Sequence, residues 1–180
     1  MVYKFVMISD EVEDFRREIY INSDATFKEL SDIILSCVGY KGEEMTSFLI
    51  CDDDWETIEE ITLLEMDTTP DKDSYVMDRT YIDEFVEEKG QKLMYVFDPY
   101  NQRSFYMELK DIKLNESLDK PVCKVKKGKA PAQMLDNLFM EDAASAKGGF
   151  DMSEFEEFNE VDGYDEDEIS DYGLDEGSMM

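Results

Sequence analysis

Histidine is absent from this chain of 180 residues. Its absence removes the two arrangements in which a histidine base activates a nucleophile, Ser-His-Asp and Cys-His. The sequence also lacks G-x-x-x-x-G-K-[ST] and G-x-G-x-x-G, the glycine-rich loops that cradle the phosphates of many nucleotides. We therefore expect no cofactor. The sequence favours a nonenzymatic role but leaves an enzymatic one open.

Cysteine is scarce, and Cys37, Cys51 and Cys123 form an odd, widely spaced set. No C-x-x-C pair is present to bind zinc or run redox exchange, so we expect free thiols in a reducing cytosol, with Cys37 as a small buried hydrophobe. Long apolar runs are also missing: no stretch approaches the roughly 20 residues of a membrane-spanning helix, and the first residues lack an apolar leader core. The sequence predicts a cytoplasmic protein without a membrane partner.

Basic residues are few, with 18 lysines and arginines against 46 acidic residues and a formal net charge of −28. Such a charge repels nucleic-acid phosphates and anionic lipids, so nucleic acid is not an expected partner. Basic proteins and divalent cations are the natural counterparts of this acidity. We expect an unidentified protein partner, and charge favours a basic one.

The acidity is concentrated near the end of the sequence. Residues 141–180 contain 15 acidic side chains and one lysine, which is half of the net charge. This segment opens with an Ala- and Gly-rich linker composition at residues 143–149 and then loses its apolar periodicity. Because like charges repel and aliphatic residues are sparse, we predict a folded domain over residues 1–140 and a disordered acidic tail over residues 141–180.

The folded part opens with a strand–strand–helix–strand pattern. Apolar residues alternate over residues 3–7 and again over residues 15–21, which predicts a β-hairpin. Thr26 and Glu29 then form a capping box, apolar residues follow at helical spacing as far as Cys37, and Gly39 offers a left-handed stop. Residues 47–51 return to extended structure. The order resembles the opening of β-grasp folds.

The second half predicts one more helix and two more strands. Four apolar residues within residues 80–89 share one helical face, and Gly90 follows them. Residues 93–97 and 104–110 are expected to be strands joined by a turn at residues 98–101. The fold class is therefore α+β, with a mixed or antiparallel sheet and two main helices. The lysine-rich run at residues 120–129 is interpreted as a solvated loop or a counter-surface for the acidic tail.

The order and spacing of these pieces resemble the plasmid pRiA4b ORF-3-like family, a bacterial and archaeal family often found beside plasmids and other mobile elements. The resemblance covers about residues 2–131, and the acidic tail lies outside it. The matching pieces are Tyr3 to Phe5, Phe15 to Ile19, Asp24 to Leu30, Gly39-Tyr40, Phe48, Trp55, Lys92 to Asp98, and the strand ending in Leu109.

This chain departs from the family pattern where the family usually has histidines. Residues 41–45 read Lys-Gly-Glu-Glu-Met where members place a histidine after the first helix, and residues 98–104 lack the usual Gly-Asp, Trp and His. Residues 130–133 keep only a remnant of the Pro-Pro-Glu-Asp stretch. A histidine-dependent activity therefore cannot transfer to this chain, and the resemblance implies no established biochemical activity.

The densest carboxylate run of the folded part is Asp52, Asp53 and Asp54. Carboxylate oxygens are the ligands that Mg²⁺ and Ca²⁺ prefer, which makes these residues weak metal candidates. Neighbours on an extended chain alternate between faces, however, so a solvated turn is the simpler interpretation. The adjacent Trp55, like Phe48, is most simply a core anchor.

The acidic tail contains aromatic side chains spread among carboxylates, a composition typical of segments that fold onto a basic partner with an apolar groove or that mimic the charge of a nucleic acid. The simpler interpretation is a disordered segment that keeps the protein soluble. The candidate partner-binding residues are Phe155, Phe158, Tyr164 and Tyr172. We identify no catalytic or cofactor-binding residue from the sequence.

Three functional hypotheses follow. The preferred one is a noncatalytic protein-binding or adaptor module that uses its domain and its acidic tail. The first alternative is a nucleic-acid-associated accessory protein of a mobile genetic element, and the second is a divalent-metal-dependent hydrolase that uses acidic side chains.

Overall fold

The computed structural model describes residues 1–66 and 74–135, so the predicted acidic tail lies outside the described residues. The chain divides into two units, Met1–Met134 and Leu135–Met180, and all of the named elements belong to the first. Within the described residues, no helix is both long and apolar enough to span a membrane.

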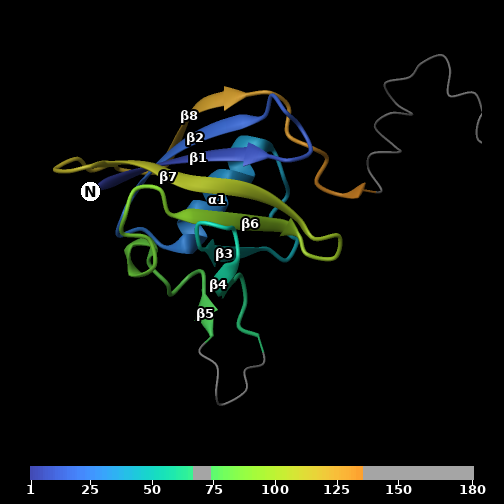
Figure 1. Cartoon of the computed structure of the whole chain (residues 1–180), viewed down its shortest axis with the longest axis horizontal. Coiled ribbons are helices and arrows are strands. Elements are labelled where there is room, and N and C mark those ends of the chain that lie inside the picture. Colours follow the sequence, from blue (N-terminus) through green and yellow to red (C-terminus); the bar gives the residue numbers. More distant parts are fainter. Residues whose placement is uncertain (67–73, 136–180) are drawn as a thin grey trace, which may run out of the picture. The chain divides into compact units, whose positions relative to one another are not determined.

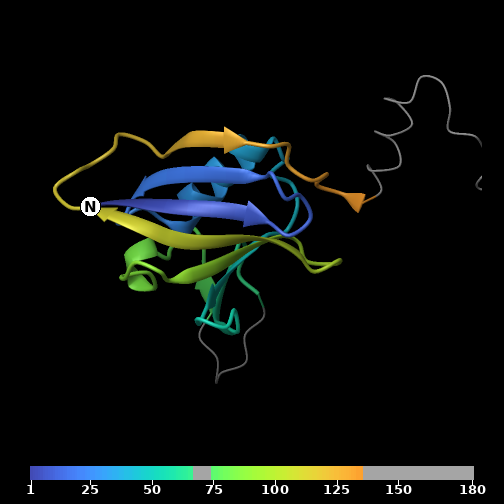
Figure 2. The same ribbon diagram turned by 45° about the horizontal axis from the view of Figure 1, so that its top comes forward.

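The first unit is built on one eight-stranded sheet with the order β5-β4-β3-β6-β7-β1-β2-β8 (Figure 1). Its strands are β1 (Val2–Ser9), β2 (Arg16–Asn22), β3 (Ser47–Cys51), β4 (Thr57–Thr62), β5 (Tyr75–Val76), β6 (Lys92–Asp98), β7 (Arg103–Lys113) and β8 (Val122–Lys127). All neighbours are antiparallel except β4 and β5, so the sheet is mixed, as predicted. Figure 2 shows β8, β2, β1 and β7 lying side by side.

The opening order of strand, strand, helix and strand is confirmed. β1 and β2 form the expected hairpin, and α1 (Phe27–Val38) follows. Both halves of its capping box are present, since the Glu29 amide donates to the Thr26 hydroxyl and the Thr26 amide donates to the Glu29 carboxylate. Gly39 ends the helix at φ +74°, where glycine has no Cβ to clash. β3 is separated from β1 by β7 and β6.

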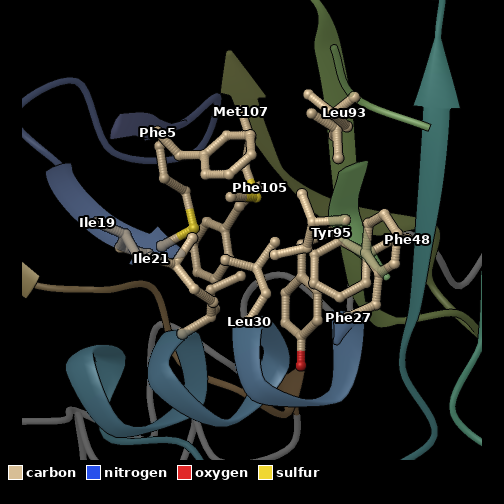
Figure 3. Packing of buried hydrophobic residues seen from close by; sticks show 14 of the residues in the cluster. Phe5, Ile19, Ile21, Phe27, Leu30, Phe48, Leu93, Tyr95, Phe105 and Met107 are labelled. Atoms are coloured by element: carbon tan, nitrogen blue, oxygen red, sulfur yellow. The ribbon is translucent and has the colours of Figure 1, made fainter. Parts of the chain in front are cut away.

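The core lies between α1 and one face of the sheet. Figure 3 shows Phe27 and Leu30 of α1 directed toward side chains of the strands, among them Phe105 and Tyr95. These four residues are fully shielded from solvent, as is Phe48, whose expected role as a core anchor is confirmed. The Tyr95 hydroxyl also shares a hydrogen bond of 2.8 Å with Ser31 of α1. Burial of several aromatic rings, at about 25 cal/mol per Å² of apolar area, provides the main stabilisation.

The prediction of two main helices is wrong, because residues 80–89 contain only the short 3₁₀ helix η1 (Ile82–Glu84). The amides of Glu87 and Glu88, which an α-helix would direct to the carbonyls of Asp83 and Glu84, donate instead to the side chain of Gln91. Nearer the start of the segment, the Ile82 amide donates to Ala25 O and the Asp83 amide to Ser23 O. Tertiary hydrogen bonds therefore override the helical periodicity.

The lysine-rich run is also different from the prediction, since residues 122–127 form the edge strand β8 rather than a loop. Its pairing with β2 depends on a partner far away in the sequence, so no local signal marks it. Its exposed lysines suit an edge position, because they discourage pairing with the edge of another sheet.

Two buried arginines fasten residues 128–133, which we call the strap, to the sheet. Arg17 of β2 donates to Gly128 O at 3.0 Å, and Arg103 of β7 donates to Ala132 O at 2.6 Å and to Gln133 O at 3.0 Å. The strap has no ladder of its own, so the guanidinium groups satisfy carbonyls that would otherwise be left without donors.

Candidate functional site

The metal candidates Asp52, Asp53 and Asp54 form the turn between β3 and β4. One carboxylate oxygen of Asp52 accepts from the amides of Asp54 and Glu56, both at 2.9 Å, so it stabilises the turn. Asp53 and Asp54 are exposed. Within residues 1–66 and 74–135, no group of three or more acidic or cysteine side chains is arranged to hold a metal ion.

Trp55 is not a core residue, contrary to the prediction. It lies half-buried at φ +67°, beyond the sheet face opposite α1, with its ring edge-on to Tyr106 at 5.1 Å. The ammonium group of Lys92 lies 5.2 Å from the centre of the indole. The left-handed turn directs the indole away from the core, which local hydrophobicity could not reveal.

A shallow outer hollow of about 230 Å³ lies at this tryptophan. Apolar side chains of β1 and β7 form its floor, and the charged groups at its rim are already paired, since Arg16 binds Glu18 at 2.7 Å and Lys110 binds Glu108 at 2.8 Å. Because these charges are paired, the hollow has little net charge and does not favour a positively charged partner over a negatively charged one.

A larger hollow of about 370 Å³ lies where the ends of β3 and β4 face residues 84–91. We call it the acidic hollow. It is lined by Ile50, Ile58, Glu59, Glu84, Phe85, Glu87, Glu88 and Gln91, with no basic residue among them. Its volume falls within the roughly 300–1,000 Å³ typical of ligand sites.

The carboxylates of the acidic hollow have no cationic partner among the residues that the structure describes. None of its four glutamates forms an ion pair with a described side chain, and Lys89, which lies between Glu88 and Gly90, is instead bound to Asp111 at 2.7 Å. Glu84 alone has a local role, accepting from the Tyr81 amide at 2.9 Å. Four negative charges around one opening, with no described cation beside them, attract a cation.

The floor of the acidic hollow is apolar. Ile58 exposes 62% of its surface although it belongs to a strand, and Phe85 is half-buried beside it. A lysine or arginine side chain has an apolar stem and a charged head, so its stem can cover Ile58 and Phe85 while its head reaches the glutamates.

Side-chain hydrogen bonds hold residues 84–91 in place. The Tyr3 hydroxyl donates to Val86 O at 2.8 Å, and the Gln91 side chain donates to Phe85 O at 3.0 Å. Burial raises the pKa of Tyr3, with a further contribution from Asp83 and Glu87, so this hydroxyl keeps its proton and remains a donor. The rim is therefore preformed, which lowers the entropic cost of binding.

The outer faces of β1, β2, β7 and β8 carry a cluster of lysines around one aromatic ring. The ammonium groups of Lys124, Lys113 and Lys4 lie 4.3, 5.3 and 5.9 Å from the centre of the Tyr20 ring. We call this the Tyr20 cluster. Lys4 is also bound to Glu18 at 3.2 Å, which reduces the positive field.

Sequence reasoning missed the acidic hollow, although the run of glutamates at residues 84–88 was visible. A helix over residues 80–89 would place Glu84, Glu87 and Glu88 together on the face opposite its apolar residues. Nothing local indicates that Ile58 and Glu59 lie opposite them. The predicted partner-binding residues Phe155, Phe158, Tyr164 and Tyr172 lie outside the described residues.

A family model described as plasmid pRiA4b ORF-3-like protein matches residues 3–168. The chain belongs to this family. The match of the pRiA4b ORF-3-like model extends beyond residues 2–131, where the motifs place the resemblance, so most of residues 141–180 lies within it. The prediction that the acidic tail lies outside the family match is therefore wrong.

A solved structure shows the same fold. The crystal structure of a protein of unknown function from Methanosarcina mazei Go1 matches this pRiA4b ORF-3-like chain with a TM-score of 0.58 and 14% identity, and the match covers 85% of each chain. No curated protein matches the chain. The family and the structural neighbour thus define the fold and assign no activity.

Proposed function

We propose that this pRiA4b ORF-3-like protein is a noncatalytic protein-binding module that takes a basic segment of a partner protein into its acidic hollow. The observation that carries the proposal is a set of four glutamates, unpaired within residues 1–66 and 74–135, around the exposed Ile58 and the half-buried Phe85. This combination suits the charged head and apolar stem of a lysine or arginine. The net charge of −28 adds long-range attraction for such a partner.

Glutamates that contact the bound segment should contribute more to affinity than acidic residues elsewhere on the protein. Exposed ion pairs contribute about 0.2–1 kcal/mol each, so removal of two glutamates should weaken binding by about 1 kcal/mol, or about fivefold. Removal of two equally exposed acidic residues elsewhere changes the net charge by the same amount. It should weaken binding less, because salt screens the attraction between charges more than about 10 Å apart.

Fluorescence anisotropy with a labelled peptide of alternating lysine and leucine tests this proposal. The variant E87Q/E88Q should lose about fivefold in affinity, whereas the control E43Q/E44Q changes two exposed acids of the loop after α1 and should lose less than twofold. The same peptide with glutamate in place of lysine should not bind. Equal losses in the two variants would show that overall charge, and not the acidic hollow, attracts the peptide.

The aromatic residues of the acidic segment form a second proposed contact. Phe155, Phe158, Tyr164 and Tyr172 alternate with carboxylates, and such segments gain affinity when their rings enter a partner's groove. Affinity capture from cells should recover partners with the full chain and fewer of them when all four residues are changed to alanine. Identical recovery would remove this contact from the proposal.

The nucleic-acid alternative has one observation in its favour, the Tyr20 cluster. An aromatic ring with lysines around it is the arrangement on which single-stranded nucleic acids stack. Anisotropy with a labelled thymidine oligonucleotide at low salt should then show binding that K113Q/K124Q weakens and K28Q/K41Q does not. Absence of binding at low salt would eliminate this alternative, because phosphate contacts are strongest there.

A further inference from the structure

Cys37 and Cys123 meet in the fold although they are far apart in the sequence. Cys37 lies in the last turn of α1, on its buried face, and exposes 6% of its surface. Cys123 lies on β8 opposite the fully buried Ile19 of β2, and it packs against the core to which Cys37 belongs. α1 and β8 are in contact, and the Cys123 side chain lies close enough to Cys37 to help raise the pKa of its thiol.

A buried arginine keeps the elements that carry the two thiols together. Arg17 donates through Nε to Cys37 O at 3.2 Å and through Nη1 to Lys127 O at 2.7 Å. One guanidinium therefore binds both the end of α1 and the end of β8. A fixed separation gives two reacting groups a high effective concentration.

The two cysteines differ in access. β8 is an edge strand and Cys123 is partly exposed, so a small reagent can reach it. Cys37 is shielded, and burial, with a contribution from Cys123, raises its pKa to about 12. Because the thiolate is the nucleophile, Cys37 is a poor first target at neutral pH. The third cysteine, Cys51, is on β3, with four strands between it and β8.

We propose that Cys37 and Cys123 form an intramolecular disulfide by exchange with a low-molecular-weight disulfide such as oxidised glutathione. The Cys123 thiolate attacks one sulfur of the reagent, which forms a mixed disulfide and releases the first thiol. Cys37 then loses its proton and attacks the Cys123 sulfur, which forms the Cys37–Cys123 bond and releases the second thiol. The two protein thiols are oxidised by two electrons, and the reagent disulfide is reduced to two thiols.

The bond would join the end of α1 to the edge strand that leads into the strap. Exchange is reversible, so the product follows the ratio of oxidised to reduced glutathione. The site is therefore one of redox modification, and it is separate from the acidic hollow, with which it shares no residue.

The experiment treats the full chain with oxidised glutathione and follows it by intact mass and peptide mapping. The wild-type protein and C51S should both lose two hydrogen atoms and yield one cross-linked pair of peptides, those of Cys37 and Cys123. C37S should stop at a glutathione adduct on Cys123. A wild-type protein that stops at the same adduct, or a cross-link that includes Cys51, would overturn the proposal.

The pH dependence of the second step gives an independent readout on the wild-type protein. Below its pKa the thiolate fraction of Cys37 rises about tenfold per pH unit, so conversion of the mixed disulfide should accelerate about tenfold from pH 7 to pH 8 and again to pH 9. A conversion rate that does not change with pH would contradict attack by this buried thiol.

Discussion

Replacement of Arg103 by methionine removes the guanidinium that joins β7 to Glu11, Asp98 and the strap while keeping an apolar side chain of similar length. The arginine side chain is 8% exposed, and its bonds reach Glu11 at 3.1 Å, Asp98 at 3.4 Å and the carbonyls of Ala132 and Gln133. The substitution leaves Asp98, with a side-chain exposure of 6%, as a buried charge without its cation.

The expected loss follows from what remains unpaired. Removal of one partner from a buried ion pair costs about 3–5 kcal/mol, because the remaining charge keeps its desolvation penalty. Asp98 still accepts two hydrogen bonds from Asn101, and Glu11 can turn toward water, so the lower end of the range, about 3 kcal/mol, applies. With a urea m-value of about 1–3 kcal/mol/M, the unfolding midpoint should fall by about 1–3 M.

Urea denaturation followed by circular dichroism measures this loss, and R79M provides the matched control. Arg79 also forms two ion pairs, with Glu65 and Asp78, but its side chain is 63% exposed, so its replacement should cost less than about 0.5 kcal/mol. The double variant R103M/D98N should recover part of the loss, because it removes the isolated carboxylate. The reasoning is refuted by a loss below about 1 kcal/mol in R103M, or by a double variant no more stable than R103M.

Three other predictions concern stability. Gly39 and Gly128 both have φ +74°, but only a Cβ at Gly128 would approach Asp14 O, at 2.6 Å. G39A should therefore lower the free energy of unfolding by about 1 kcal/mol and G128A by at least about 2 kcal/mol in the same urea assay. Equal losses would mean that the contact with Asp14 relaxes. Burial by itself raises the pKa of Asp98, but hydrogen bonds from Asn101 and Arg103 outweigh it and hold the pKa below the ordinary 3.8. Its contribution is therefore complete above that pH and is lost as the pH falls below 3.8, so the stability of D98N should depend less steeply on pH in this range. T26A removes the hydroxyl half of the capping box of α1 and should lower the free energy of unfolding by about 1 kcal/mol, and an unchanged midpoint would contradict that role.

Local signals are sufficient for α1 and for the first hairpin. The helix begins after a threonine whose hydroxyl satisfies an orphan amide and ends before a glycine in the left-handed region, and both effects act within one turn of chain. The alternation over residues 3–7 and 15–21 likewise specifies which face is buried, whatever the strands pair with. The α+β class and the family were predictable from the sequence for the same reason.

Residues 80–89 show where local signals fail. Their apolar spacing suits a helix, yet the amides of Glu87 and Glu88 donate to the Gln91 side chain and the Gly90 amide donates to Leu109 O, so the chain turns instead. The strand β8 is the converse case, since its lysine-rich sequence has no strand signal until β2 provides the pairing partner. In both segments the energy of long-range hydrogen bonds exceeds the small differences in local propensity.

The sequence by itself determined the hairpin, α1, the acidic character and the family, because each depends on neighbouring residues or on composition. Only the tertiary structure decided that Ile58 and Glu59 of β4 face Glu87 and Glu88, and that Trp55 lies outside the core. The meeting of Cys37 with Cys123 was decided in the same way. Charge repulsion and solvation depend on composition and can be read from the sequence. Which side chains line one hollow depends on the order in which the strands pair, and that order is a property of the tertiary structure.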